Sequence, residues 1–106
     1  MKCFYHKADQ DGNCSGAIVK IKHPGCEMIG MNYGDAFPWD SIIKEETVYI
    51  VDFSLEVDDM KKLDSMCDLH WIDHHENIVK QVEKEIHIKG YRDFSDGACL
   101  LTFQYL

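Results

Sequence analysis

Seven aspartate and histidine side chains fall in three short segments of the chain, each close to the end of a stretch of apolar residues. They are His6, Asp9, Asp11, Asp52, Asp73, His74 and His75. Carboxylate and imidazole ligands without thiolates favour Mn²⁺ or Mg²⁺-class ions over structural zinc. Crowded carboxylates repel one another unless they are protonated or bridged by cations. If these side chains meet, they therefore predict a divalent-metal centre.

Each aspartate also has a simpler structural interpretation when it is taken alone. Asp9 or Asp11 could be a turn residue or the cap of a helix that begins near Cys14, and Asp52 could cap the next helix. We interpret His23, His70 and His87 as structural residues. An Asp-His-His tripeptide at the end of an apolar strand is much harder to explain structurally, so the joint set favours a site.

Short apolar segments alternate with segments of helical period, which is the pattern of a parallel α/β sheet. We predict strands over residues 2–6, 27–32, 47–51, 69–72 and 85–88. Helices are predicted around an apolar stripe of Cys14, Ala17, Ile18 and Ile21, and over 55–66, 78–84 and 97–106. The expected fold is α/β, a Rossmann-like, mainly parallel five-stranded sheet flanked by helices. The carboxyl ends of its strands form the functional crevice, and all three polar segments lie there.

Metal ions would make this edge suitable for phosphate chemistry. About five ligands leave room for two ions ~3.5–4 Å apart that share a bridging carboxylate, an arrangement suited to in-line attack on phosphorus. Composition limits the other classes, because the 106 residues suffice for one domain and carry a formal net charge of -8. This charge excludes a basic nucleic-acid clamp or a polybasic membrane patch.

The cysteines and the absence of targeting signals predict a cytoplasmic protein. Five cysteines without a close pair argue against a disulfide framework and favour free buried thiols in a reducing compartment. No window approaches the ~20 apolar residues that span a membrane, and the first residues are too polar for a signal peptide.

Three motifs in this order resemble those of a known family. Asp9-x-Asp11-Gly12 with Ser15 and an upstream His6, then Val51-Asp52-Phe53-Ser54, then Asp73-His74-His75 look like motifs I, II and III of the DHH phosphoesterase superfamily. The segments 6–12 and 32–35 are most similar to its oligoribonuclease-like, nano-RNase branch. The resemblance extends from residue 3 to the end of the chain.

The resemblance implies a role for each residue. His6, Asp9 and Asp52 would hold one metal, and Asp11, the bridging Asp52 and His74 the second. His75 would contact the scissile phosphate or the bridging water, and Asp73 would orient an imidazole from behind the ligands. The ions would be two Mn²⁺, with Mg²⁺ and Co²⁺ left open. Two residues separate His6 from Asp9, a spacing that some members of the family do not share.

The activity implied is a metal-dependent phosphoesterase that hydrolyses phosphodiester or phosphoanhydride bonds of nucleotides or short oligoribonucleotides. The partner would be a phosphate-containing small molecule or short single-stranded RNA. We expect neither duplex DNA nor a membrane as a partner. Residues 1–106 would form a truncated catalytic domain without the fourth motif and the carboxy-terminal substrate-binding domain. We therefore expect little or no activity from this chain, and self-association, as in a homodimer, through the apolar helix 97–106.

Two other functions remain open at this point. A signalling receiver domain would use the acidic pair after the first strand, Asp52, and Lys89 after the last strand. However, a receiver needs a small hydroxyl residue where this chain has Asp73-His74-His75. The third hypothesis is a catalytically inactive interaction domain.

Overall fold

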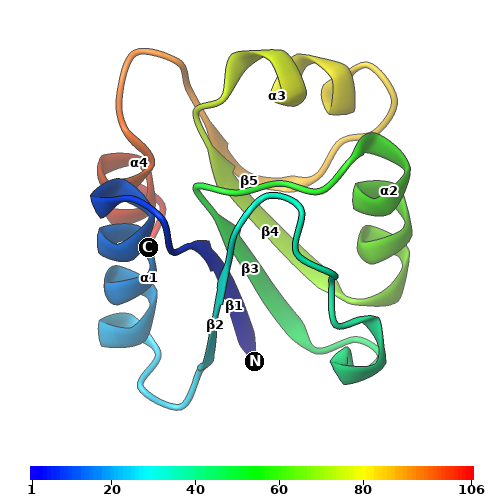
Figure 1. The fold of residues 1–106 in the computed structure, drawn as a ribbon, viewed down its shortest axis with the longest axis horizontal. Coiled ribbons are helices and arrows are strands. Elements are labelled where there is room, and N and C mark those ends of the chain that lie inside the picture. The colour runs from blue at the N-terminus through cyan, green and yellow to red at the C-terminus, as the bar shows by residue number, and fades with distance from the viewer.

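The computed structural model describes residues 1–106, in which five parallel strands form one sheet between helices (Figure 1). The elements in chain order are β1 Lys2–His6, α1 Gln10–Lys22, β2 Glu27–Met31, the 3-10 helix η1 Trp39–Ser41, β3 Thr47–Val51, α2 Val57–Met66, β4 Asp68–Asp73, α3 Glu76–Glu83, β5 Lys89–Arg92 and α4 Ala98–Tyr105. The predicted α/β fold with a five-stranded parallel sheet is confirmed.

The strand order places the ends of β1 and β3 at the centre of the sheet. The order is β2-β1-β3-β4-β5, and every neighbouring pair is parallel. The chain first moves outward from β1 to β2 and then crosses back to β3, so its direction reverses between β1 and β3. In open α/β sheets, ligands bind at the carboxyl ends of the strands at such a switch point.

Both faces of the sheet are covered, which explains why the central strands are apolar throughout. α1 and α4 lie side by side on one face, and α2 and α3 cover the other (Figure 1). Alternate residues of each strand enter the two cores. Phe4, Ile50 and Trp71 pack toward α2 and α3, whereas Val51 and Ile72 pack in the core shared with α1 and α4.

The apolar stripe predicted for the first helix is not its buried face. α1 buries Gly12, Ser15, Gly16 and Val19, and Ile21 of the predicted stripe is 80% exposed. The reason is close approach, because a Cβ on Gly12 would lie 1.8 Å from the carbonyl oxygen of His6. The helix turns Gly12, Ser15, Gly16 and Val19 toward the sheet, so Cys14, Ala17 and Ile21 of the predicted stripe are exposed.

The last strand was predicted four residues too early. It runs over Lys89–Arg92, whereas residues 85–88 belong to the turn and the connection that follow α3. The amides of Glu85 and Ile86 both donate to the carbonyl of Val82, which continues the helical turn. Ile88 is only 1% exposed and packs in the core cluster beneath α2 and α3. Its apolar character reflects this packing rather than a strand.

The prediction that all cysteines are free thiols is wrong for two of them. Cys14 of α1 and Cys99 of α4 form a disulfide, with Cα atoms 5.6 Å apart. The pairing depends on the packing of two helices that are distant in the sequence. Cys3, Cys26 and Cys67 are free. No helix combines the length and apolar character needed to cross a membrane.

Candidate metal centre

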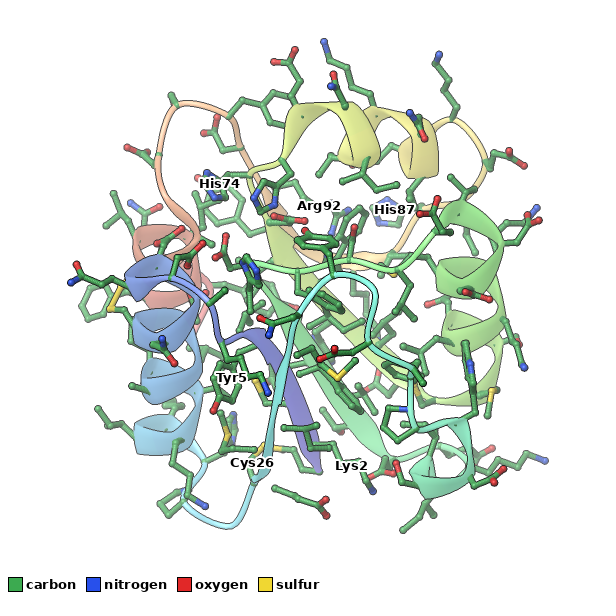
Figure 2. The ribbon with its side chains drawn as sticks, in the orientation of Figure 1. Lys2, Tyr5, Cys26, His74, His87 and Arg92 are labelled. Carbon is green, nitrogen blue, oxygen red and sulfur yellow. A yellow bond between two sulfur atoms is a disulfide. The ribbon has the colours of Figure 1, made fainter.

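The seven predicted site residues all lie at the carboxyl ends of β1, β3 and β4. The region is at the top of Figure 2, where His74 is labelled. β1 ends at His6, and β4 ends at Asp73. Asp9 is the N-cap of α1, and His75 occupies the N-cap position of α3. Asp52 directly follows β3, His74 directly follows β4, and Asp11 is the second residue of α1.

His6, Asp9 and Asp52 form a first group of potential metal ligands, with one ligand atom from each within 4.8 Å of the others. The Nδ1 of His6 lies 3.2 Å from Oδ2 of Asp9 and 3.8 Å from Oδ2 of Asp52. The other oxygen of Asp9 accepts a 2.7 Å hydrogen bond from the amide of Gly12. Partial burial acts to raise the pKa of Asp9, but hydrogen bonds from Gly12 and Asp52 and the nearby His6 lower it overall.

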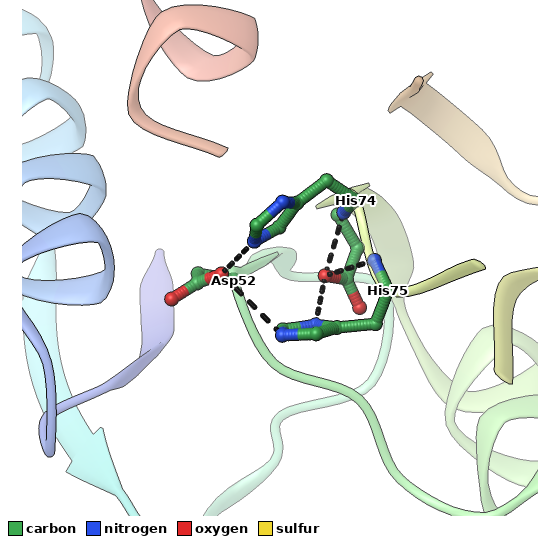
Figure 3. A group of neighbouring side chains, drawn as sticks. Asp52, His74 and His75 are labelled. Atoms are coloured by element: carbon green, nitrogen blue, oxygen red, sulfur yellow. Dashed lines mark hydrogen bonds and ion pairs between the residues drawn. The ribbon is translucent and has the colours of Figure 1, made fainter. Parts of the chain in front are cut away.

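A second group contains Asp52, Asp73, His74 and His75. Figure 3 shows both imidazoles directed at Asp52. Oδ1 of Asp52 lies 2.9 Å from Nε2 of His74 and 4.0 Å from Nε2 of His75. Adjacent side chains of a regular strand point to opposite sides, but these two do not. His75 lies beyond β4 at the start of α3, and the two rings lie side by side with centroids 4.6 Å apart.

Asp52 belongs to both groups and lies between them. The residue is fully buried, and its backbone φ of +54° places it in the left-handed region directly after β3. Such conformations cost free energy in residues other than glycine and are concentrated at functional sites. Burial raises the pKa of Asp52 to about 8, with further contributions from the negative charges of Asp11 and Asp9. A bound cation would offset both effects.

Asp73 positions the two histidines rather than facing the first group. Its Oδ1 accepts hydrogen bonds from the amide of His74 at 2.8 Å, from the amide of His75 at 3.3 Å and from the ring Nδ1 of His75 at 2.6 Å. This last contact is the main cause of a raised pKa for His75. It also directs Nε2 of His75 toward Asp52. The imidazole that Asp73 contacts is that of His75, not that of the predicted ligand His74.

Asp11 is held in place by the amino end of α4. Its two carboxylate oxygens accept hydrogen bonds from the amides of Ala98 at 2.9 Å and Cys99 at 2.8 Å. The oxygen bonded to Ala98 also lies 3.3 Å from Nε2 of His74. Sequence reasoning assigned Asp11 to the metals but missed these donors.

The unpartnered buried atoms of the site fit the donor set of a divalent cation. Buried side-chain atoms without a hydrogen-bond partner are His6 Nδ1, Asn32 Oδ1, Asp52 Oδ2 and Asp73 Oδ2. Three of these four atoms belong to the predicted site, and each is a lone-pair donor for a metal when deprotonated. Buried polar atoms are nearly always partnered, so unpartnered ones indicate an unseen ligand. The donor set is oxygen and nitrogen only, which suits Mn²⁺, Mg²⁺ or Co²⁺.

Aromatic side chains line one side of the centre, a feature that sequence reasoning did not assign. The ring of Tyr33 lies 5.1 Å from that of His6 and 6.3 Å from that of His75, measured between centroids. It also contacts Phe53, the residue after Asp52, at 4.9 Å. Burial, together with the charges of Asp73 and Asp52, raises the pKa of Tyr33 to about 12. The phenol therefore stays protonated beside the carboxylates.

The structure removes one of the features that supported a receiver domain. Lys89 is the first residue of β5 and pairs with His70 in the register of the sheet, three positions before Asp73 and Arg92. Its ammonium forms an ion pair with Asp68, at the amino end of β4. Lys89 therefore lies toward the amino ends of the strands, whereas Asp52 lies at the carboxyl end of β3. It cannot complete a phosphoacceptor site.

No family model, curated protein or solved structure matches this chain in the comparisons with known proteins.

Proposed function

We propose that this protein is a divalent-metal-dependent phosphoesterase that hydrolyses phosphodiester or phosphoanhydride bonds of nucleotides or short oligoribonucleotides. The observation that carries the proposal is that the buried Asp52 is shared by two groups of ligands. One carboxylate between two such groups is the arrangement of a two-metal centre. The resemblance of the three motifs to the DHH phosphoesterase superfamily supports the same function.

The proposed ligands are His6, Asp9 and Asp52 for one ion, and Asp11, Asp52 and His74 for the other. Bound ions would supply a nucleophilic hydroxide and offset charge on the phosphate oxygens. Within the chain itself, Asp73 accepts the Nδ1 proton of His75 and so leaves Nε2 facing the centre. The raised pKa of His75 favours its protonated form, which can donate a hydrogen bond to a phosphate oxygen.

The identity of the ions and of the partners forms part of the same proposal. Two Mn²⁺ ions are the proposed cofactor, and a phosphate-containing small molecule or short single-stranded RNA is the proposed substrate. The proposed location is the cytoplasm. Cys3, Cys26 and Cys67 remain free, as a reducing compartment would keep them, whereas the Cys14–Cys99 disulfide is unusual there. Self-association through the exposed Phe103 of α4 remains a prediction, which sedimentation velocity can test.

The metal centre can be tested by spectroscopy as well as by activity. The full chain, stripped with a chelator, is titrated with Mn²⁺ in a calorimeter and by electron paramagnetic resonance. We expect two sites and a spin-coupled signal, because ions that share Asp52 lie close together. A single site, or two ions without coupling, would overturn the two-metal proposal.

The phosphoesterase activity needs a separate assay. The Mn²⁺-loaded chain is incubated in ¹⁸O-labelled water with pyrophosphate, adenosine bisphosphate, a cyclic dinucleotide and a dinucleotide. Mass spectrometry then shows whether label enters the phosphate of the product. We expect slow turnover, below about 1 s⁻¹. The reason is that the ligand groups contain no aspartate from a fourth motif of the family that the chain resembles. Labelled product that depends on Mn²⁺ would support the function, whereas turnover that is equal with and without the metal would contradict it.

A further inference from the structure

We propose that the aromatic pocket beside the metal centre is a subsite for a nucleobase that carries an exocyclic amino group. This inference rests on the proposed function, because the base would be part of the molecule whose phosphate lies at the centre. The pocket has a volume of about 360 Å³, which is within the range of ~300–1,000 Å³ for small-molecule sites. Its walls are the loop after β2 and the segment between β3 and α2. The lining residues include the aromatic Tyr33, Phe37, Trp39 and Phe53 and the acidic Glu56 and Asp59.

Four of the lining residues are aromatic and lie in two pairs. The ring centroids of Tyr33 and Phe53 are 4.9 Å apart, and those of Phe37 and Trp39 are 4.7 Å apart. Phe53 is buried beneath Tyr33, whereas Tyr33 is 52% exposed. Tyr33 therefore offers a supported ring to a ligand. Flat aromatic rings are the usual stacking surface for nucleobases in single-stranded nucleic acids.

The pocket is continuous with the metal centre through Tyr33. The same ring that lines the pocket lies 5.1 Å from the ring of His6 and 6.3 Å from that of His75. Phe53, which lines the pocket, directly follows Asp52 in the chain. A phosphate at the metal centre and a ring against Tyr33 are thus neighbours, as the phosphate and base of one nucleotide are.

The charges in the pocket select which part of a nucleotide enters it. Asp35, Glu56 and Asp59 are exposed lining residues, and no lysine or arginine is among the lining residues. Asp35 uses Oδ2 to accept a hydrogen bond from the amide of Asn32 at 2.9 Å, which holds the loop in place. Carboxylates repel a phosphate but accept hydrogen bonds from amino groups. Adenine, cytosine and guanine have such groups, whereas uracil presents carbonyl oxygens instead.

A larger cavity of about 500 Å³ lies between α1 and α4, lined by Ile18, Ile21, Lys22, Phe103 and Leu106. None of these residues bears a carboxylate or an imidazole, and none belongs to the metal centre. The smaller aromatic pocket is therefore the better candidate for part of a substrate.

Calorimetric titration of the Mn²⁺-loaded full chain with simple phosphate compounds tests the subsite. The probes are inorganic phosphate, ribose 5-phosphate, uridine monophosphate and adenosine monophosphate, with adenosine as the probe that has a base but no phosphate. We expect adenosine monophosphate to bind about tenfold more tightly than ribose 5-phosphate, which is the contribution of one stacked base. Uridine monophosphate is expected to bind less tightly than adenosine monophosphate.

Variants assign the effect to the pocket. Tyr33→Leu should remove the difference between adenosine monophosphate and ribose 5-phosphate, whereas Tyr33→Phe should keep it because the ring remains. Replacing Glu56 by Gln and Asp59 by Asn together should bring the affinities for the adenosine and uridine compounds closer. Phe103→Leu is the matched control, because Phe103 is an aromatic residue 70% exposed on α4, outside the pocket.

The outcomes separate this inference from the proposed function. Equal affinities for adenosine monophosphate and ribose 5-phosphate would overturn the subsite and leave the phosphoesterase proposal intact. If adenosine and uridine monophosphate bind equally tightly, and both bind more tightly than ribose 5-phosphate, the selection for an amino group would be overturned. If no phosphate compound binds the loaded chain, but adenosine binds in a manner that depends on Tyr33, the subsite stands and the proposed function fails.

Discussion

At the scale of single residues, Asp52 is the side chain on which both ligand groups depend. Asp52→Asn preserves the size of the side chain, and asparagine tolerates the left-handed backbone that φ of +54° requires. We expect this change to abolish both Mn²⁺ sites, whereas Asp9→Asn should weaken mainly one. Calorimetric titration with Mn²⁺ measures the stoichiometry in each variant. Two sites persisting in Asp52→Asn would contradict the bridging role.

His75 should affect turnover more than metal binding, and His74 the reverse. Nε2 of His74 is 2.9 Å from Asp52, whereas Nε2 of His75 is 4.0 Å away and its Nδ1 is engaged by Asp73. In a chain shown to be active, His75→Ala should lower kcat by about 100-fold or more, the usual contribution of one hydrogen-bond donor that stabilises charge in the transition state. Metal content, measured by mass spectrometry of the ions, should stay unchanged. Loss of metal in His75→Ala with an active His74→Ala would reverse the assignment.

At the scale of secondary-structure elements, Gly12 sets the distance between α1 and the end of β1. A Cβ at this position would lie 1.8 Å from the backbone oxygen of His6, so Gly12→Ala must move the helix that carries Asp9 and Asp11. We expect a loss of about 1–3 kcal/mol in the free energy of unfolding and weaker Mn²⁺ binding. Gly25→Ala is the control, because its Cβ meets nothing within 4 Å. If urea denaturation shows equal losses of stability in Gly12→Ala and Gly25→Ala, this would argue against the close approach of Gly12 to His6.

The disulfide between α1 and α4 joins the two helices that hold Asp11. It closes a loop with a sequence separation of 85, and removing a disulfide from a loop of this size costs about 2–4 kcal/mol. Replacing Cys14 and Cys99 together by Ser should lower stability to denaturant by this amount, and reduction of the parent should do the same. The free Cys67, half-buried on the other side of the sheet, provides the control as Cys67→Ser. No effect of reduction would show that the two thiols are unpaired in solution.

For the whole molecule, the metal-free protein should become less stable as pH rises from about 4 to about 8. The folded-state pKa of Asp52 is about 8 against an ordinary value of 3.8, because burial and the neighbouring Asp11 and Asp9 favour its protonated form. A group with a raised folded-state pKa contributes stability that is fully present when the pH is below its ordinary pKa. This stability is lost as the pH rises through the folded-state pKa. His75, with a raised pKa, acts in the same direction above its ordinary value of 6.5.

Thermal unfolding with a chelator and with Mn²⁺, over pH 5.5–8.5, measures this dependence. The metal requires deprotonated ligands, so the gain in Tm on adding Mn²⁺ should grow with pH. Metal-free Asp52→Asn should be more stable than the metal-free parent, and its Tm should vary less with pH. A metal-free variant that melts below the parent would show that the carboxylates do not repel one another as the structure indicates.

Local patterns in the sequence were sufficient to predict the fold class and the position of the candidate site. The β-branched run 47–51 is a central strand in both the prediction and the structure. Because parallel strands end at one edge, the segments after them had to converge, and His6, Asp9, Asp11, Asp52, Asp73, His74 and His75 all lie there. These features depend on the periodicity and length of short segments, which the sequence carries directly.

Other features arise only from contacts between segments that are far apart in the chain. The buried face of α1 is decided by the close approach of Gly12 to His6, not by the apolar residues that helical periodicity marks. The amides of Ala98 and Cys99 reach Asp11 across 87 and 88 positions, and the Cys14–Cys99 disulfide depends on the same packing. Such contacts have no local pattern, because the packing of helices against the sheet determines which distant residues meet.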